Sequence, residues 1–431
     1  MTNGLATVIC IVCLLLIPLA ACGMALVNSG LGRSRAAAHT MIASLCIFSV
    51  AVIMYFVCGF GFQGFAGAPS HVLNAGGKQW DWIGAAPFFF RKFELDGSSA
   101  SLVAVFSMLC AGLAALIPLG AAAERWRLRA MCASTALLAG FTFPLFNHWV
   151  RVGGWLDQVG INYGLGHGFI DVGGSGWIQA VGGLTALSIV WILGPRRGKY
   201  SSTKMPNAIP AHSAVFVVFG GILCWVGWLG LNSAGAILFG GATPGQTLLV
   251  IVNTTLAAAA AGLSALIVTG LRFGRPDASL TCNGWIGGLV ASSAGCLFIK
   301  PAEAVVAGAI AGILVTYAVE WLEFGLKVDD PGGSISAHAV GGIWGLLAAG
   351  LFARFPAQSG SNSGQFIAQL VGIATLLGFV LPFTYGVNRL LNWLVPYRVS
   401  IEGERQGMDL HELGADAYPE FVVHTEEFIQ R

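Results

Sequence analysis

Two polar side chains occupy the same place in a segment that occurs twice in the chain. The first copy, GGSGWIQAVGG, covers residues 173–183, and the second, GGSISAHAVGG, covers 332–342. Seven of the eleven positions agree, and the residue before each AVGG is Gln179 in one copy and His338 in the other. Both side chains donate and accept hydrogen bonds, but only the imidazole takes up a proton near neutral pH. They are the first candidates for a site that binds a small polar solute.

The composition places these residues in a membrane protein. Of 431 residues, 56% are hydrophobic and only 10% are charged, whereas soluble proteins carry about a quarter charged residues. Apolar runs recur along the whole length, so the chain forms its own membrane domain. The 60 glycines indicate helices that approach closely. No catalytic triad, zinc-ligand spacing or phosphate loop is present, and we expect no enzyme activity, no cofactor, no metal and no nucleic-acid partner.

The apolar runs predict eleven transmembrane helices and an all-α membrane fold. The expected spans are 5–27, 39–62, 101–122, 129–147, 172–194, 209–231, 247–270, 281–299, 303–325, 334–353 and 367–392. The first span is interpreted as a retained helix, with a cleaved signal as the alternative. The connection over 63–100 is expected to be a solvated lid, or else a partner or trimer contact.

The distribution of basic residues predicts the orientation. Sixteen lysines and arginines fall in one alternate set of connections and in the tail, against six in the other set. Because basic residues concentrate on the cytoplasmic side, we expect a multi-pass cell-membrane protein with its amino terminus outside. The membrane domain then covers 1–392, and 393–431 form a cytoplasmic tail.

In this orientation the two copies of the repeated segment run in opposite directions across the membrane. We therefore predict an inverted repeat of five spans each, over about 1–194 and 209–353, with an eleventh helix at 367–392 appended. Gln179 and His338 each lie about two turns inside their helix. Glycine pairs follow both side chains and allow the two helices to approach, so the amide and the imidazole are expected to meet near the midplane.

Each of these polar residues also has a purely structural interpretation. His338 could be a buried histidine satisfied by a neighbouring hydroxyl or carbonyl, and Gln179 could serve only to join helices. Asp171 could cap the fifth span, or its charge could favour cations near the pore mouth. Trp228 could be packing or pore wall.

Several segments carry a resemblance to one family, the ammonium transporters (Amt/Mep/Rh), over nearly the full length. They are SGLGRSRAAAHTM at 29–41, GAAAERWRL at 120–128, HWVRVGGWL at 148–156, GWLGLNSAG at 227–235, VDDPGGSISAHAVGGIWG at 328–345 and GMDLHELGADAY at 407–418. The resemblance implies an eleven-helix homotrimer with one pore per subunit and a tail that can meet a PII-type signalling protein.

The resemblance also implies roles for single residues. His338 takes the place of the second of two stacked pore histidines, and Asp171 that of an acidic residue near an outer cation vestibule. Trp228 corresponds to the pore-side tryptophan and Phe106 to an outer aromatic residue. Asn232 belongs to the matching GWLGLN segment.

Five departures from the family pattern fall on the implied substrate path. Gln179 replaces the first pore histidine, and Arg151 replaces the vestibule tryptophan. Cys110 and Leu231 replace the two gate phenylalanines, and Gly235 replaces a vestibule serine. If transport moves a proton along paired imidazoles, Gln179 breaks the relay; if it needs only a polar bridge for ammonia, Gln179 suffices.

Because of Arg151, the sequence does not decide which substrate the protein carries. Two unit charges 4 Å apart repel by about 1 kcal/mol in water and about 4 kcal/mol at an effective dielectric of 20. The smaller cost applies if the guanidinium turns into solvent or pairs with Asp157. Three hypotheses remain: transport of ammonium or ammonia, transport of another small polar or anionic nitrogen compound on the same fold, and a non-conducting ammonium sensor.

Overall fold

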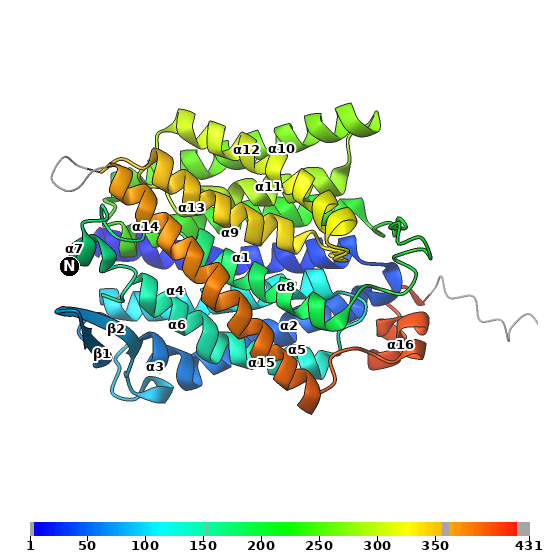
Figure 1. The fold of residues 1–431 in the computed structure, drawn as a ribbon, viewed down its shortest axis with the longest axis horizontal. Coiled ribbons are helices and arrows are strands. Elements are labelled where there is room, and N and C mark those ends of the chain that lie inside the picture. The colour runs from blue at the N-terminus through cyan, green and yellow to red at the C-terminus, as the bar shows by residue number, and fades with distance from the viewer. Residues whose placement is uncertain (1–3, 152, 356–361, 420–431) are drawn as a thin grey trace, which may run out of the picture.

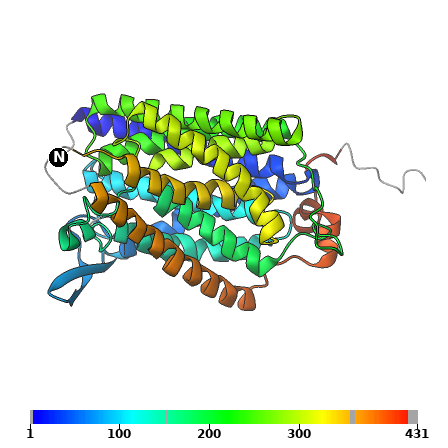
Figure 2. The ribbon, with the colours of Figure 1, turned by 45° about the horizontal axis from the view of Figure 1, so that its top comes forward.

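The computed structural model describes residues 4–151, 153–355 and 362–419, and the last part of the predicted tail, 420–431, lies outside them. Long helices run side by side and antiparallel in one bundle (Figures 1 and 2). A small hairpin projects from the end of the bundle where the amino terminus lies, and helix α16 covers the opposite end. We call these ends the hairpin face and the tail face.

The first half of the bundle contains helices α1 to α8. Their bounds are α1 Gly4–Leu31, α2 Ala37–Met54, α3 Phe60–Gln63, α4 Ser99–Ala122, α5 Leu128–Leu137, α6 Phe143–Val150, α7 Val159–Tyr163 and α8 Val181–Leu193. A π-helical segment, Ser175–Ala180, leads directly into α8.

The second half contains α9 to α16. Their bounds are α9 Ala214–Phe239, α10 Thr247–Phe273, α11 Ala278–Ser293, α12 Pro301–Glu320, α13 Gly341–Phe352, α14 Asn362–Thr375, α15 Leu381–Leu394 and α16 Ile401–Gln406. A second π-helical segment, Ile335–Val340, leads into α13. The two copies of the repeated segment therefore have the same local structure.

Ten continuous helical stretches among the described residues are long and apolar enough to cross a membrane, which supports the all-α membrane fold. The predicted span 281–299 is the exception, because α11 has only 16 residues. Ser175 intervenes where α11 ends: its hydroxyl donates to the carbonyl of Val290 and accepts from the amide of Ala294 (2.7 and 2.8 Å). The chain beyond the helix is held instead by Asn253, whose amide donates to the carbonyls of Cys296 and Ile299.

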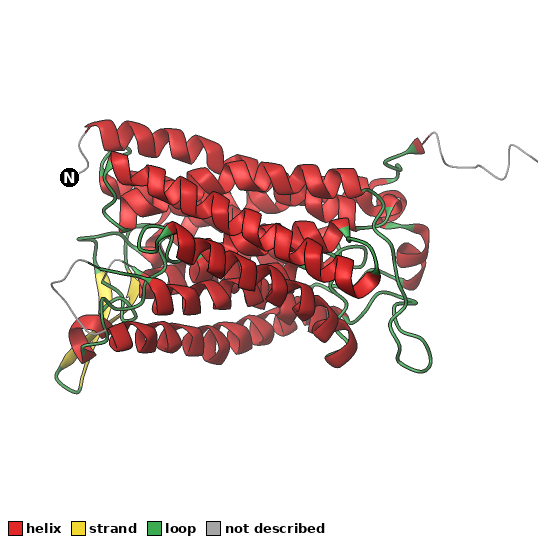
Figure 3. Ribbon diagram, turned by 90° about the horizontal axis from the view of Figure 1, so that it is seen from above, coloured by secondary structure: helices red, strands yellow, loops and turns green. Residues whose placement is uncertain are grey.

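The connection 63–100 contains the main departure from an all-helical chain. Strands β1 Ser70–Ala75 and β2 Lys78–Gly84 pair antiparallel, and helices otherwise dominate the bundle (Figure 3). Gly76 and Gly77 form the two-residue turn with φ of +61° and +73°. Both angles lie in the left-handed region that tight hairpin turns require and that glycine adopts freely.

The two copies of the repeated segment pack against each other reciprocally. A Cβ added to Gly183 would lie 2.8 Å from Cα of Ala339, and one added to Gly342 would lie 3.1 Å from the amide nitrogen of Ala180. Each copy thus places its second AVGG glycine against the alanine of the other copy. The exact boundaries of the two repeats stay a prediction.

We expect Gly183→Val to destabilise the bundle, because the added side chain must push Ala339 away, at a cost of about 1–3 kcal/mol for overpacking. Gly386→Val on α15 is the matched control, since nothing lies within 4 Å of a Cβ at that position. Thermal unfolding of both purified variants is the measurement. Equal unfolding midpoints for Gly183→Val and the control would contradict the close contact.

Candidate functional site

The side chains of Gln179 and His338 meet inside the bundle. His338 Nδ1 lies 2.7 Å from Gln179 Oε1, and both residues are buried, with 5% and 0% of their surface exposed. An amide oxygen only accepts hydrogen bonds, so with this amide orientation Nδ1 carries the proton and Nε2 of His338 presents a lone pair. Gln179 Nε2 is buried and has no hydrogen-bond partner among the described residues. The pair therefore offers one free NH2 group, with two N–H donors, and one acceptor nitrogen.

Equivalent aspartates lie just before the two π-helical segments that carry this pair and cap them. The Asp171 carboxylate accepts from the backbone amides of Gly174, Gly176 and Trp177 at 2.7–3.1 Å. Asp171 is thus a buried helix cap, one of the two interpretations of this residue. Burial raises its pKa to about 6, although Arg151 and the backbone amides act in the opposite direction.

Asp330 does the same for the second segment. Its carboxylate accepts from the amides of Ser334 and Ile335 at 3.0 and 2.7 Å, and burial raises its pKa to about 6. Each capping aspartate precedes its member of the central pair by eight residues. The caps consequently fix the depth of Gln179 and His338 from opposite faces.

Arg151 meets neither of the two conditions under which its repulsion of a cation would be small, namely turning into solvent or pairing with Asp157. Arg151 is buried, and no ion pair joins it to Asp157 in the part of the chain that the structure describes. Its Nη2 donates to the carbonyl oxygens of Asp171 and Val172, the latter at 3.0 Å. Burial lowers its pKa to about 10 despite the opposing effect of Asp171 and Asp157, so it remains a cation at neutral pH.

Two aromatic rings face this guanidinium, and a third packs against both of them. Its Cζ lies 3.5 Å from the centre of the Phe239 ring and 4.9 Å from that of Trp177, and Phe106 contacts both rings at centroid distances of 5.6 and 5.9 Å. We call Phe106, Trp177 and Phe239 the aromatic cage. Ring faces attract cations, and here the cation is supplied by the chain itself.

Sequence reasoning identified Phe106 but missed the other two members of the cage. Trp177 lies two residues before Gln179 in the repeated segment, so its place in the repeat could have marked it. Phe239 ends α9 in an ordinary apolar run, and nothing in the sequence distinguishes it.

The remaining candidate residues lie around this centre and are buried. On α9, Trp228 donates to Ser293 Oγ (3.1 Å), and the Asn232 amide donates to Thr254 Oγ1 (2.9 Å). A Cβ on Gly235 would lie 2.5 Å from the carbonyl oxygen of Val172, the same oxygen that accepts from Arg151. A serine at 235 would therefore disturb the segment that Arg151 holds.

Cys110 on α4 and Leu231 on α9, the other two substitutions on the expected path, are fully buried. Neither side chain is polar enough to orient a solute, and a cysteine is smaller than the phenylalanine expected at that position. They contribute packing to the interior of the bundle.

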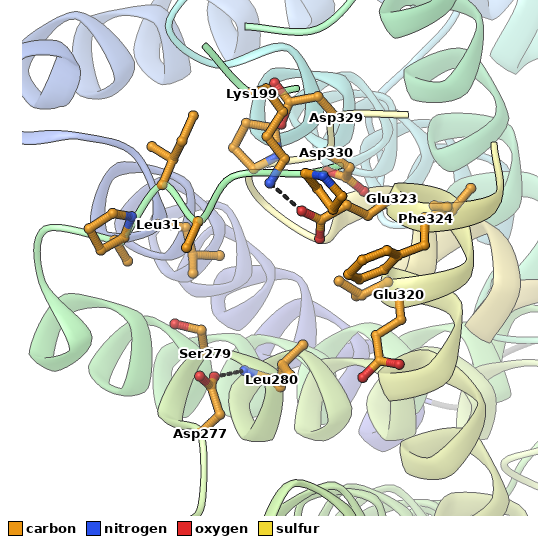
Figure 4. Close-up of a pocket in the computed structure, with 18 of the residues that line it drawn as sticks. Leu31, Lys199, Asp277, Ser279, Leu280, Glu320, Glu323, Phe324, Asp329 and Asp330 are labelled. Carbon is orange, nitrogen blue, oxygen red and sulfur yellow. Dashed lines mark hydrogen bonds and ion pairs between the residues drawn. The ribbon is translucent and has the colours of Figure 1, made fainter. Parts of the chain in front are cut away.

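A cavity lies at each end of the paired segments. The hairpin-face cavity has a volume of about 780 Å³ and is lined in part by Arg151, Asp171 and Phe239. The tail-face cavity, of about 590 Å³, is lined in part by Asp330 and by Lys199, which points toward Glu323 in Figure 4. Gln179 lies eight residues after Asp171 of the hairpin-face cavity, and His338 lies eight residues after Asp330 of the tail-face cavity.

A buried ion network holds the tail-face end of the second segment. Arg196 binds both carboxylate oxygens of Asp329 at 2.9–3.0 Å and Glu124 at 2.6 Å. Arg125 donates to the backbone carbonyl of Asp329 at 2.7 Å. Burial raises the pKa of Asp329, but Arg125 and Arg196 lower it further, to about 2. The stabilising contribution of Asp329 therefore depends on its carboxylate being ionised.

We expect Asp329→Asn to cost at least about 2 kcal/mol at pH 7, since the folded pKa lies below the ordinary 3.8. A depressed pKa gives stabilisation that is complete above about pH 4 and is lost as the pH falls toward 2. The gap in unfolding midpoint between wild type and variant should be constant from pH 7 to about 4 and then narrow. Asp416→Asn, which removes a tail carboxylate, is the control; a gap that is unchanged at pH 2.5 would refute the role of Asp329.

Comparison with known proteins agrees with this architecture. The Ammonium Transporter Family profile matches residues 8–418. Ammonium transporter Amt2 of Archaeoglobus fulgidus is 34% identical, over 97% of this chain and 89% of its own. Among solved structures, one described as Sensor Amt Protein superposes with a TM-score of 0.85 at 29% identity, covering 94% of this chain and 98% of its own. Mep2 of Saccharomyces cerevisiae gives a TM-score of 0.77 at 26% identity, covering 92% and 89%. The match across nearly the whole chain makes this protein a member of the ammonium transporter family.

Proposed function

We propose that the protein carries ammonium nitrogen across the membrane and that the species passing the Gln179–His338 pair is neutral ammonia. The observation that supports this most directly is the buried hydrogen bond between the two side chains, with a cavity at each end of the segments that carry them. Relatives with the same architecture are described as ammonium transporters.

The hydrogen-bonding pattern of the pair fits ammonia better than ammonium. Ammonia has one lone pair and three N–H groups, so it can accept from Gln179 Nε2 and donate to His338 Nε2. Ammonium has only donors and would leave the buried Gln179 Nε2 unsatisfied, a cost of about 1–3 kcal/mol. Gln179 cannot take a proton, so protons do not pass between the two side chains.

At the hairpin face, Arg151 also favours neutral ammonia over the ammonium ion. A guanidinium already occupies the aromatic cage, where the rings would otherwise attract an ammonium ion. A second cation there would meet repulsion of about 4 kcal/mol at 4 Å and an effective dielectric of 20. Arg151 therefore disfavours a cation at the aromatic cage, although Asp157 and Asp171 line the same hairpin-face cavity, and a neutral solute meets no such repulsion.

The same proposal gives the other residues their roles. His338 and Gln179 bind the solute, Arg151, Asp171 and Phe106 form the entrance, and Trp228, Asn232 and Gly235 support it from α9. Cys110 and Leu231 occupy the positions of the gate residues in the family. We further propose a homotrimer with one path per subunit, the hairpin face outside, and a tail face in the cytoplasm that can meet a PII-type signalling protein.

A second candidate is a non-conducting ammonium sensor. The burial of Arg151 in the aromatic cage favours it, because this side chain partly fills the expected entrance. One structural neighbour is itself described as a sensor. A sensor would bind ammonium and change the tail without moving the solute across the membrane.

The proposal is tested by uptake of labelled methylammonium into cells that lack their own ammonium transporters. We expect uptake by the wild type, and a fall of about tenfold or more in His338→Ala, because the variant removes the acceptor and leaves Gln179 unpaired. The control is His71→Ala, which changes an exposed histidine on β1.

Uptake by His338→Ala equal to that of the control would contradict the proposed path. Wild-type protein that reaches the membrane and binds ammonium but gives no uptake would instead favour the sensor.

A further inference from the structure

A pocket on the tail face lies apart from the path and gathers positive charge. Its volume is about 560 Å³, and it forms where three distant segments meet. Arg33 and Arg35 come from the turn before α2, Arg197 from the connection after α8, and Arg405 from α16. Glu404 is the one carboxylate among the residues that line it. We call these four arginines the arginine cluster.

The carboxylates near the arginine cluster are already shared. Glu404 Oε2 lies 2.8 Å from Arg398 Nη2 and 3.6 Å from Arg197 Nε, and its Oε1 accepts from the Arg197 backbone amide. Glu124 binds both Arg33 and Arg196. Each carboxylate therefore serves two guanidinium groups, and the pocket retains an excess of positive charge.

Two members of the cluster have donors left for a ligand. Arg405 forms no ion pair within the described residues, and its side chain is exposed. Arg35 donates to the backbone carbonyls of Arg405 and Glu404 at 3.0 and 3.3 Å, and it forms no ion pair in the described part of the chain. A guanidinium has five N–H donors, and these contacts use only part of them.

We propose that the arginine cluster binds a phosphate group. Planar guanidinium forks match the oxygens of a phosphate, which accepts several charge-assisted hydrogen bonds at once. A pocket of this size holds a phosphate together with part of the group that bears it. The phosphate can belong to a soluble phosphorylated compound or to the headgroup of an anionic lipid at the membrane surface.

Binding there would tie the tail to the transport path. The tail docks beside the pocket, since Asp409 accepts from the amides of Ala38 and His39, and Glu412 contacts the His39 ring at 2.8 Å. Arg197 directly follows Arg196, which holds Asp329, the neighbour of the cap of the His338 segment. A bound phosphate would hold α16 and this connection together.

The test measures binding to the purified full-length protein, independently of transport. Inorganic pyrophosphate is titrated by calorimetry at low salt, and thermal unfolding is compared in nanodiscs of phosphatidylcholine alone and with added phosphatidic acid. We expect binding in at least one arm and about tenfold weaker binding in Arg405→Gln, which removes charge-assisted hydrogen bonds. Arg389→Gln, which changes an exposed arginine near the end of α15, is the control and should match the wild type.

The two arms identify the source of the phosphate. Pyrophosphate binding that depends on Arg405 supports a soluble ligand, whereas stabilisation by phosphatidic acid alone supports a lipid headgroup. The proposal is overturned if neither probe binds, or if Arg405→Gln and Arg389→Gln weaken binding equally.

Discussion

The hydrogen bond between His338 and Gln179 is possible only because two antiparallel segments approach almost to backbone contact. Gly183 lies against Ala339 and Gly342 against Ala180, so neither helix could carry a side chain at those glycines and keep the distance of 2.7 Å between Nδ1 and Oε1. The symmetric placement of Asp171 and Asp330 sets the depth of each partner. Helix packing in a membrane relies on such small residues, and here it also places the two polar groups.

Both ends of these segments use a buried arginine, but in different electrostatic settings. Arg125 donates to the backbone carbonyl of Asp329 and sits in a network with compensating carboxylates. Arg151 donates to the backbone carbonyls of Asp171 and Val172 and rests on aromatic rings without an ion pair in the described chain. The tail-face arginines are thus joined to carboxylates by ion pairs, whereas Arg151 forms none in the described chain, although Asp157 and Asp171 line the same cavity. In the proposed function, the guanidinium without an ion pair is what disfavours a cation relative to a neutral solute.

The sequence predicted the features that depend on repetition and hydropathy. Ten of the eleven expected spans, the opposed directions of the two copies and the meeting of an amide with an imidazole followed from residue order. The position of Arg151 did not follow from residue order. Whether its side chain turns to solvent, pairs with Asp157 or enters an aromatic cage depends on where Phe239 lies at the end of α9. The hairpin over 70–84 was missed although its Gly76–Gly77 turn is a typical hairpin signal, because its strands are mostly exposed and lack a clear apolar alternation. The early end of α11 depends on a serine from another helix.

The most direct test of the central claim is to measure nitrogen flux and charge movement together in proteoliposomes. After an inward ammonium gradient is applied, a solid-supported membrane records current while a trapped dye records internal pH. Passage of neutral ammonia between Gln179 and His338 predicts internal alkalinisation without a current above that of empty liposomes. A current of one positive charge for each nitrogen transported, without alkalinisation, would contradict the account.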